Sequence, residues 1–372
     1  MKILLVFGTR PEAIKMCPLV NQLKSDPRFD VAVCVTAQHR HMLDQVLSLF
    51  DVVPDFDLDL MQQHQTLEWL TSAIVTEVSK VIKEYQPQLV LVHGDTTTSF
   101  AAALAAFYQQ VDVGHVEAGL RTGDLQSPWP EEANRKMTAT LSQLHFAPTQ
   151  VAADNLLAEG ISEEKVFVTG NTVIDALLTT VEQNLLQNTP PRLTGLFETC
   201  EQRQVILITG HRRENFGSGF ERICQALKHI ALQHPHVQLI YPVHLNPKVH
   251  EPVHAQLGHL ENFHLIEPLD YQAFVRLMSR ADIILTDSGG IQEEAPSLHK
   301  PVLVLRDKTE RLSAVAAGTV KLVGTDVDTI VEQVNQLLLE PNAFGHAQNP
   351  YGDGKACARI TNIIAQHYGL VS

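Results

Sequence analysis

Short apolar runs alternate with longer segments of helical periodicity along this chain, and the whole alternation occurs twice. In the first half, apolar runs at 3–7, 31–36, 89–93, 111–116 and 144–147 are separated by helical segments at 11–25, 66–85, 97–109 and 131–142. In the second half, runs at 205–209, 238–242, 263–266, 282–286 and 302–305 are interleaved with helical segments at 220–233, 271–279 and 329–339. Continuous apolar strands separated by helices are typical of a parallel sheet covered on both faces. The sequence therefore predicts an α/β chain of two doubly wound, Rossmann-like domains.

The length of 372 residues fits two domains of roughly 150 to 200 residues better than one. We expect the first domain at 1–168 and the second at 169–354, with a hinge near 168–172 and a polar loop at 187–204. The last helix, within 355–372, is expected to pack back on the first domain. Open sheets of this kind bind ligands at the carboxyl ends of their strands. We therefore expect the two domains to face each other across a cleft lined by those ends.

Composition excludes several classes of function. The formal net charge of −14 argues against a broad basic surface for nucleic acid. The five cysteines are scattered without a CxxC pair, and the histidines lack both an HExxH pattern and converging carboxylates, so no metal site is predicted. No apolar run reaches the roughly 18 residues of a membrane span, and the run after Lys2 is too short for a signal peptide. We expect a cytoplasmic protein that binds neither nucleic acid nor membranes.

Two cations follow the first strand. Arg10 and Lys15 lie just past a turn in which Gly8 and Pro11 suit a strand-to-helix connection with free backbone amides. The turn lacks the GxGxxG pattern, so it does not indicate a nicotinamide cofactor. A helix opening with solvated charges is the alternative interpretation.

Three carboxylates follow later segments of the first half. Asp95 comes directly after the strand at 89–93, Glu117 after the strand at 111–116, and Glu131 after Pro130. Packing explains an acid at the end of a buried strand poorly, because unpaired acids are rarely buried. For Asp95 the alternative is a helix N-cap, and for Glu131 it is a favourable interaction with a helix dipole. All three are candidates to face the cleft.

The strand ends of the second half suit a nucleotide. His211 and Arg212 open a loop after the strand at 205–209, where guanidinium groups match phosphate oxygens. The sequence Ser288-Gly289-Gly290 opens a helix after the strand at 282–286 and offers free amides as a phosphate cradle. Glu294, one turn into that helix, is positioned to accept hydrogen bonds from ribose hydroxyls. This is the strongest nucleotide signal in the chain.

Eleven segments, in order, closely resemble the bacterial non-hydrolysing UDP-N-acetylglucosamine 2-epimerases. They are FGTRPEAIKM at 7–16, TAQHR at 36–40, HGDTTT at 93–98, GHVEAGLRTGD at 114–124, SPWPEEANR at 127–135, TGNTVIDAL at 169–177, GHRREN at 210–215, YPVHLNP at 241–247, LTDSGGIQEEAPSL at 285–298, KPVLVLRDKTER at 300–311 and NPYGDG at 349–354. Where many members read TERPE, this chain has TERLS at 309–313. The resemblance runs nearly end to end.

The resemblance implies a glycosyltransferase-B type fold, a homodimer, and no metal or other cofactor. It also implies catalytic residues, substrate-binding residues and a second site at which the substrate activates the enzyme. The catalytic residues are Asp95, Glu117, Glu131 and His211; the substrate-binding residues are Arg10, Lys15, Phe274, Ser288, Gly289, Gly290, Glu294 and Arg311; the activating site comprises Gln38, His39, Arg212 and His244.

The implied reaction inverts carbon 2 of UDP-N-acetylglucosamine to give UDP-N-acetylmannosamine, a precursor for cell-surface polysaccharides. UDP is eliminated to leave 2-acetamidoglucal and then adds back, while a proton returns to the other face of C2. The diphosphate needs cations and amides, and the proton transfers need acid–base groups around C2.

Three other functions remain open at this point. A glycosyltransferase of the same fold would use the same UDP cradle but require an acceptor. A hydrolysing epimerase would release free N-acetylmannosamine and UDP. A non-catalytic UDP-sugar sensor would have little use for several carboxylates beside an anionic ligand.

Overall fold

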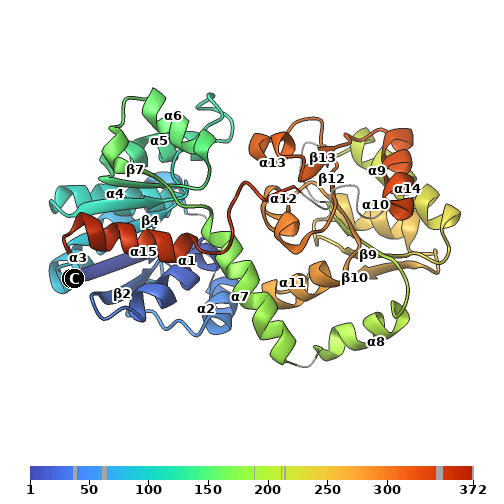
Figure 1. Cartoon of the computed structure of the whole chain (residues 1–372), viewed down its shortest axis with the longest axis horizontal. Helices are drawn as coiled ribbons and strands as arrows, with labels where there is room; N and C mark the ends of the chain where they lie inside the picture. The colour runs from blue at the N-terminus through green and yellow to red at the C-terminus, as the bar shows by residue number, and fades with distance from the viewer. Residues whose placement is uncertain are drawn as a thin grey trace. The chain divides into compact units, whose positions relative to one another are not determined.

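The computed structural model describes residues 1–36, 40–60, 65–187, 189–210, 212, 215–340 and 347–370, without the side chains of Arg40 and His41. The chain forms two compact units (Figure 1). Unit 1 comprises Met1–Ala176 and Tyr351–Ser372, and unit 2 comprises Leu177–Pro350. The chain passes between the units twice, within helix α7 (Thr172–Leu186) and between Pro350 and Tyr351.

The described part of unit 1 holds a seven-stranded sheet in the order β3-β2-β1-β4-β5-β6-β7, with every pair parallel. Its strands are β1 (Lys2–Phe7), β2 (Asp30–Val35), β3 (Phe56–Asp57), β4 (Leu89–His93), β5 (Asp112–Val116), β6 (Leu144–Ala147) and β7 (Val166–Val168). Its helices are α1 (Arg10–Lys24), α2 (Arg40–Leu49), α3 (Leu67–Tyr85), α4 (Thr97–Tyr108), α5 (Glu131–Leu141), α6 (Gln150–Ala158), the first part of α7, and α15 (Ala356–His367).

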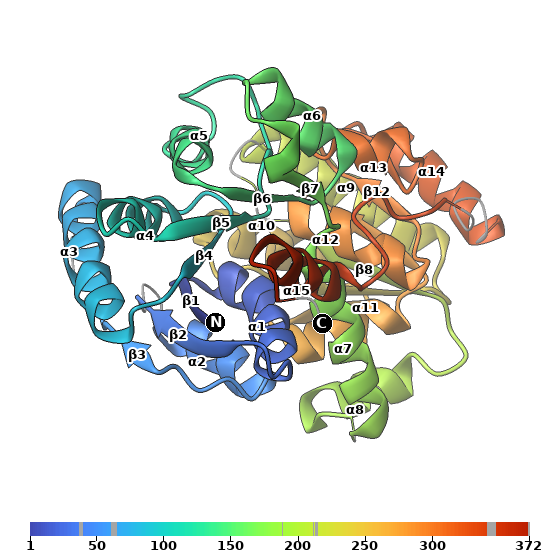
Figure 2. The same cartoon turned by 60° about the vertical axis from the view of Figure 1, so that its left-hand side comes forward.

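Apolar residues on alternate positions of these strands cover both faces of the sheet. Leu4 and Val6 of β1, with Val90 and Val92 of β4, pack against α3 and α4. The intervening residues of β1 are equally buried, on the face where α1 and α15 lie (Figure 2). Because successive side chains of a strand point to opposite faces, a run that is apolar throughout requires helices on both sides.

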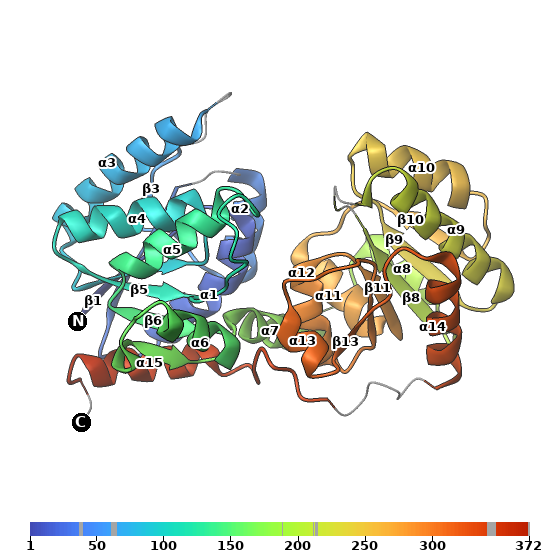
Figure 3. The same ribbon diagram turned by 90° about the horizontal axis from the view of Figure 1, so that it is seen from above.

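Unit 2 repeats this architecture. In the part of it that the structure describes, six parallel strands lie in the order β10-β9-β8-β11-β12-β13, and α9, α10 and α14 bury one face of the sheet while α11 and α12 lie on the other (Figure 3). The strands are β8 (Val205–Thr209), β9 (Gln238–Pro242), β10 (Phe263–Ile266), β11 (Ile283–Thr286), β12 (Val302–Val304) and β13 (Val320–Leu322). The helices are α8 (Pro191–Thr199), α9 (Ser218–Gln233), α10 (Pro247–Leu257), α11 (Tyr271–Arg280), α12 (Gly289–Glu294), α13 (Leu312–Ala316) and α14 (Val327–Leu339).

The predicted fold class, two Rossmann-like α/β domains, is confirmed. The ten predicted strands all form, with ends that agree within one residue. The predicted loop at 187–204 is wrong, because α8 occupies Pro191–Thr199. This helix buries a single side chain, Leu193, so its sequence carries almost no periodic apolar signal. Among the residues described, none of the helices combines the length and apolar character that crossing a membrane requires.

Three buried histidines lie on neighbouring strands of unit 1. His93 ends β4, and His115 of β5 pairs in register with His145 of β6. Burial lowers the pKa of His93 and His145 to about 4 and that of His115 to about 3. Nε2 of His115 lies 2.7 Å from the carbonyl oxygen of Gly94, and a carbonyl only accepts, so Nε2 carries the proton. The folded sheet therefore holds these rings neutral.

We expect the stability of unit 1 to fall as the pH drops from about 6.5 towards 4. Over that range the unfolded chain binds protons that the folded sheet excludes, which lowers the free energy of unfolding by up to about 1.4 kcal/mol per pH unit for each histidine. Both tryptophans, Trp69 and Trp129, belong to unit 1, so their fluorescence during urea unfolding reports this unit. His115→Gln keeps a donor for Gly94 and should reduce the slope between pH 7 and pH 5. Equal slopes for variant and wild type would contradict the assignment.

Candidate active site

In each unit the strand order reverses at one point, between β1 and β4 in unit 1 and between β8 and β11 in unit 2. Helices leave the two strands in opposite directions there, and ligands bind outside the carboxyl ends of such strands. The predicted residues Arg10, Asp95 and Glu117 follow β1, β4 and β5 at this end of the unit 1 sheet. In unit 2, Arg212 follows β8, and the turn Ser288-Gly289-Gly290 follows β11.

A buried carboxylate fixes the switch point of unit 1. Glu12, only 2% exposed, accepts hydrogen bonds through Oε2 from the backbone amides of Gly8 (3.1 Å) and Thr9 (2.8 Å). Its Oε1 accepts from the hydroxyls of Thr96 (2.7 Å) and Ser99 (3.1 Å) at the start of α4. Burial raises the pKa of Glu12, and the hydrogen bonds from Thr96, Thr9 and Gly8 oppose that rise. One side chain thus joins the turn that carries Arg10 to the turn that carries Asp95.

Glu117 lies in a network with three other polar residues. Its backbone has a φ of 62°, a left-handed conformation that is uncommon outside glycine and often marks functional sites. Its Oε2 is paired with Nζ of Lys15, accepts a hydrogen bond from Nδ2 of Asn171 (2.8 Å), and lies 3.8 Å from Nε2 of His93. Lys15, predicted as a diphosphate ligand, is therefore in direct contact with a predicted acid.

Asp95 is held by α5. Its Oδ2 accepts from Nη2 of Arg135 at 2.5 Å, and its backbone carbonyl accepts from Nδ2 of Asn134 at 3.0 Å. Burial raises the pKa of Asp95 against the influence of Arg135, and the nearby carboxylates of Glu117 and Glu131 raise it further. The predicted alternative of an N-cap is wrong, because the N-cap of α4 is Thr96, which accepts from Ser99.

Two consecutive acids at the start of α5 have different surroundings. Glu132 is fully buried; it accepts from the backbone amides of Thr122 and Gly123 and pairs with Nη1 of Arg135 at 3.1 Å. Glu131, the first residue of α5, is only partly buried. Arg135 thus connects Glu132 to Asp95. Glu131 is not part of this ion-pair network.

In unit 2 the turn after β11 contacts a loop cation. A Cβ atom on Gly289 would lie 2.9 Å from Cζ of Arg311, so the guanidinium group packs directly on this glycine. Nε of Arg311 donates to Oε1 of Glu293 at 2.8 Å, and Nη1 lies 3.0 Å from Oε1 of Glu310. Arg311 is the N-cap residue of α13, which begins at Leu312. The departure from the family's sequence after Arg311 therefore falls in a helix, and Arg311 stays beside the glycine turn.

A hydrogen bond joins α11 to the predicted ribose ligand on α12. Tyr271 of α11 donates from its hydroxyl to Oε1 of Glu294 at 2.6 Å, and burial raises its pKa well above the usual value. Phe274 lies one turn further along α11 and is half-buried. Asn349 donates to the carbonyl oxygen of Glu293 at 2.8 Å and so anchors the end of α12.

The predicted activating residues are only partly described. The backbone amide of Arg212 donates to Oδ2 of Asp287 at 2.8 Å, and its Nη2 lies 3.9 Å from Oε1 of Glu310. His244 is exposed, and its Nδ1 accepts from the backbone amide of Asn246 at 3.1 Å. Gln38, His39 and the predicted catalytic residue His211 lie outside the described residues. Within the described ranges, no group of three or more His, Cys, Asp or Glu side chains could hold a metal ion.

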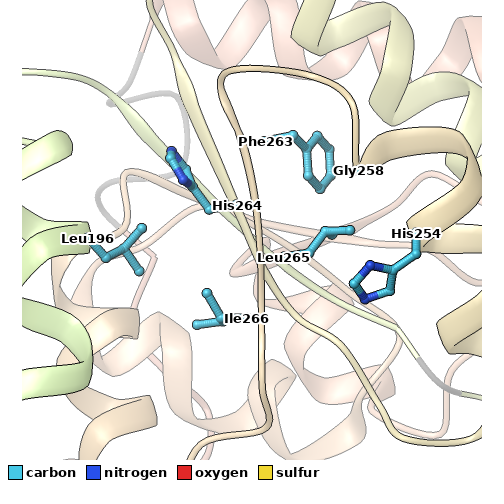
Figure 4. A pocket seen from close by; sticks show the side chains of 7 residues that line it. All are labelled: Leu196, His254, Gly258, Phe263, His264, Leu265 and Ile266. Carbon is cyan, nitrogen blue, oxygen red and sulfur yellow. The ribbon is translucent and has the colours of Figure 1, made fainter.

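A cavity of about 390 Å³ lies elsewhere in unit 2 (Figure 4). It is lined by residues of the edge strand β10 together with Leu196 of α8 and His254 of α10, and it contains none of the predicted site residues. It lies at the edge of the sheet, away from the switch point between β8 and β11.

Known proteins resemble this chain over almost its whole length. A family model described as UDP-N-acetylglucosamine 2-epimerase matches residues 21–365. The UDP-N-acetylglucosamine 2-epimerase of Salmonella typhimurium is 57% identical over 377 residues, which cover 99% of both chains, and that of Escherichia coli K12 is 58% identical over 369 residues and 98% of both. The crystal structure of UDP-GlcNAc 2-epimerase from Neisseria meningitidis bound to UDP-GlcNAc is 51% identical, with a TM-score of 0.87, over 98% of this chain and 100% of that one.

The neighbouring acids Glu131 and Glu132 should respond differently to the same substitution. Glu132→Gln breaks a buried ion pair with Arg135 and should lower the free energy of unfolding by about 3 kcal/mol. Glu131→Gln lies outside that network and should change it by less than about 0.5 kcal/mol. Urea unfolding followed by tryptophan fluorescence measures both. Equal effects would contradict the structural role given to Glu132.

Proposed function

Because this chain belongs to the UDP-N-acetylglucosamine 2-epimerase family, we propose that it interconverts UDP-N-acetylglucosamine and UDP-N-acetylmannosamine by eliminating UDP and adding it back. The observation that carries this proposal is the set of carboxylates at the switch point of unit 1, each with a defined partner: Asp95 with Arg135, and Glu117 with Lys15 and Asn171. A protein that only bound an anionic nucleotide would gain nothing from acids at this position.

Carbon 2 carries a hydrogen that is not adjacent to a carbonyl group, so direct deprotonation is prohibitively difficult. In the proposed path a carboxylate removes the C2 proton as the C1–O bond breaks, UDP leaves with the bonding electrons, and a C1=C2 double bond forms. In the return step the UDP oxygen bonds to C1, and an acid delivers a proton to the opposite face of C2. Proton transfer by a positioned carboxylate contributes about 10²- to 10⁴-fold to such steps.

The three candidate acids differ in the neighbouring charges and burial that favour their ionised or protonated form. The Lys15 ammonium group beside Glu117 favours the ionised form, which is the form that a base requires. Burial raises the pKa of Asp95, which favours a carboxyl group that holds and delivers a proton nearer neutral pH. Glu131 lies close enough to Asp95 to raise its pKa, so the two acids are coupled. We propose that Asp95, Glu117 and Glu131 divide the proton transfers.

Cations and free backbone amides are proposed to bind the diphosphate. These are Arg311, the amides of the turn Ser288-Gly289-Gly290, Arg10 and Lys15. Charge-assisted hydrogen bonds from guanidinium groups and free amides at a helix start suit phosphate oxygens. Glu294 is proposed to accept from the ribose hydroxyls, with Phe274 nearby, and His211 to assist the leaving phosphate.

Further properties of the family are proposed for this chain. UDP-N-acetylglucosamine is proposed to act both as substrate and as activator, with Gln38, His39, Arg212 and His244 at the activating site. We also propose that the chain works as a homodimer in the cytoplasm and supplies precursors for cell-surface polysaccharides.

Replacing any one of the three acids by its amide should reduce turnover about 100-fold or more, because the amide cannot carry the proton. NMR of UDP-N-acetylglucosamine in D₂O measures this as the appearance of UDP-N-acetylmannosamine deuterated at C2, without any acceptor. Glu159→Gln is the matched control, since Glu159 pairs with Arg121 and Lys136 elsewhere on unit 1 and should keep normal turnover. Near-normal rates in Asp95→Asn, Glu117→Gln and Glu131→Gln would refute the assignment, and free N-acetylmannosamine as product would indicate hydrolysis.

Gly289→Ala should weaken UDP binding by displacing Arg311. An added Cβ would collide with the guanidinium group, so Gly289→Ala and Arg311→Ala should each reduce UDP affinity about tenfold or more and should not be additive in the double variant. Isothermal titration with UDP measures all three. At Gly290 the added Cβ would lie 3.8 Å from Oε2 of Glu294, an ordinary contact, so any effect of Gly290→Ala should add to that of Arg311→Ala. Additive losses for Gly289→Ala and Arg311→Ala would show that they act separately.

A further inference from the structure

The two segments through which the chain enters and leaves unit 2 are joined inside unit 1. The backbone amide of Asn171, just before α7, donates to the carbonyl oxygen of Tyr351 at 2.7 Å. Gly170, with a φ of 87°, lies so close to the returning segment that a Cβ atom would be 3.2 Å from that same carbonyl oxygen. Only glycine adopts this conformation readily at such a distance. The backbone of residues 170–171 is therefore fixed against that of 351–352.

Side chains strengthen this connection. Asp175 of α7 accepts hydrogen bonds from the backbone amides of Ala356 (3.1 Å) and Cys357 (2.9 Å), the first two residues of α15. Nη1 of Arg359 donates to the carbonyl oxygen of Thr169 at 3.1 Å. The start of α7 and the start of α15 thus form one hydrogen-bonded assembly, which we call the crossover assembly (residues 169–175 and 351–359).

Asn171 is the member of the crossover assembly that reaches the candidate acids. Its side chain is 3% exposed. Oδ1 accepts from the backbone amide of Val173 at 3.0 Å and so fixes the side chain at the start of α7. Nδ2 donates to Oε2 of Glu117 at 2.8 Å. Both ends of this amide are therefore engaged, one with the helix that leads to unit 2 and the other with a carboxylate.

We propose that Asn171 is a positioning residue that orients the carboxylate of Glu117 for proton transfer and makes that orientation depend on the crossover assembly. The inference rests on the proposed function, in which Glu117 is an acid–base group. A carboxylate on a long side chain needs a second fixed donor besides a flexible lysine to hold its plane. Asn171 supplies that donor from a backbone that the two chain crossings hold in place.

The charged and titratable groups around Glu117 come from several elements. Lys15 of α1 pairs with its Oε2, His93 at the end of β4 lies 3.8 Å away, and Asp95 follows the same strand close enough for Glu117 to raise its pKa. Asn171 does not titrate, so a substitution there can alter the orientation of Glu117 without removing one of its charged or titratable neighbours.

The test is Asn171→Asp, which keeps the shape of the side chain and an oxygen for the amide of Val173 but replaces the donor to Glu117 by a second carboxylate. We expect kcat to fall about 10- to 100-fold. We also expect the limb of the pH–rate profile that Glu117 controls to shift to higher pH by on the order of one unit or more, since a second carboxylate nearby disfavours the ionisation of Glu117. Asn171→Ser removes the donor without adding charge and should lower kcat with a smaller movement of that limb.

A double variant separates positioning from a general loss of structure. If Asn171 acts through Glu117, adding Asn171→Asp to Glu117→Gln should not reduce the residual rate further. Asn21→Asp is the matched control, because Asn21 donates to the carbonyl oxygen of Phe50 in the same unit without touching Glu117, and it should keep the normal profile.

Two results would overturn the proposal. One is normal kcat and a normal pH profile in folded Asn171→Asp, or in Asn171→Ser where the first variant does not fold. The other is an equal loss in the wild-type and Glu117→Gln backgrounds. Near-normal turnover of Glu117→Gln alone would instead remove the acid–base role of Glu117, and the positioning role with it, whatever the Asn171 variants do.

Discussion

The buried carboxylate of Glu12 is the contact on which the geometry of unit 1 depends. A parallel sheet places the ends of β1 and β4 side by side, but it does not fix the two turns that leave them in opposite directions. Glu12 accepts hydrogen bonds from two backbone amides of one turn and from two hydroxyl groups of the other. It thereby fixes the position of the turn that carries Arg10 relative to the turn that carries Asp95. Burying a carboxylate is unfavourable unless its hydrogen bonds are satisfied, and four donors satisfy it here.

Contacts, rather than residue type, separate structural acids from candidate catalytic ones in this chain. Glu132 and Glu131 are neighbours of the same chemistry, yet Glu132 is fully buried against Arg135 and two backbone amides, whereas Glu131 is partly exposed at the helix start. Arg135 pairs with both Glu132 and Asp95, so the fixed position of Glu132 also constrains Asp95. Glu132 has no part in the proposed proton transfers, yet through Arg135 it helps to determine where the candidate catalytic acid Asp95 lies.

The sequence predicted the strands well because their apolar runs leave little choice: a run such as that of β4, buried at all five positions, suits only the middle of a parallel sheet. It failed at α8, which buries one leucine, and it missed β7, whose three residues pair with β6 and end at Val168, where the predicted hinge begins. Of the site, it identified side chains at strand ends but not their partners. Thr9 and Glu12 show the spacing of a capping box, a signal that was available in the sequence. No local spacing indicated that Asn171 contacts Glu117, because the two residues are 54 positions apart in the sequence and only the fold brings them together.

The two units share one architecture. In each unit, charged residues of the candidate site form ion pairs with residues of opposite charge from the same unit. In unit 1 the candidate acids have Lys15 and Arg135 as partners; in unit 2 Arg311 has Glu293 and Glu310. A diphosphate that binds Arg311 must compete with carboxylates already in contact with it, so the net gain in binding is smaller than a lone guanidinium group would give. For a reaction in which UDP has to leave C1 and return, weak ground-state binding is an advantage, because only interactions that strengthen in the transition state accelerate the chemical step. We infer that the acids beside Arg311 limit how tightly the diphosphate is held before the C1–O bond breaks.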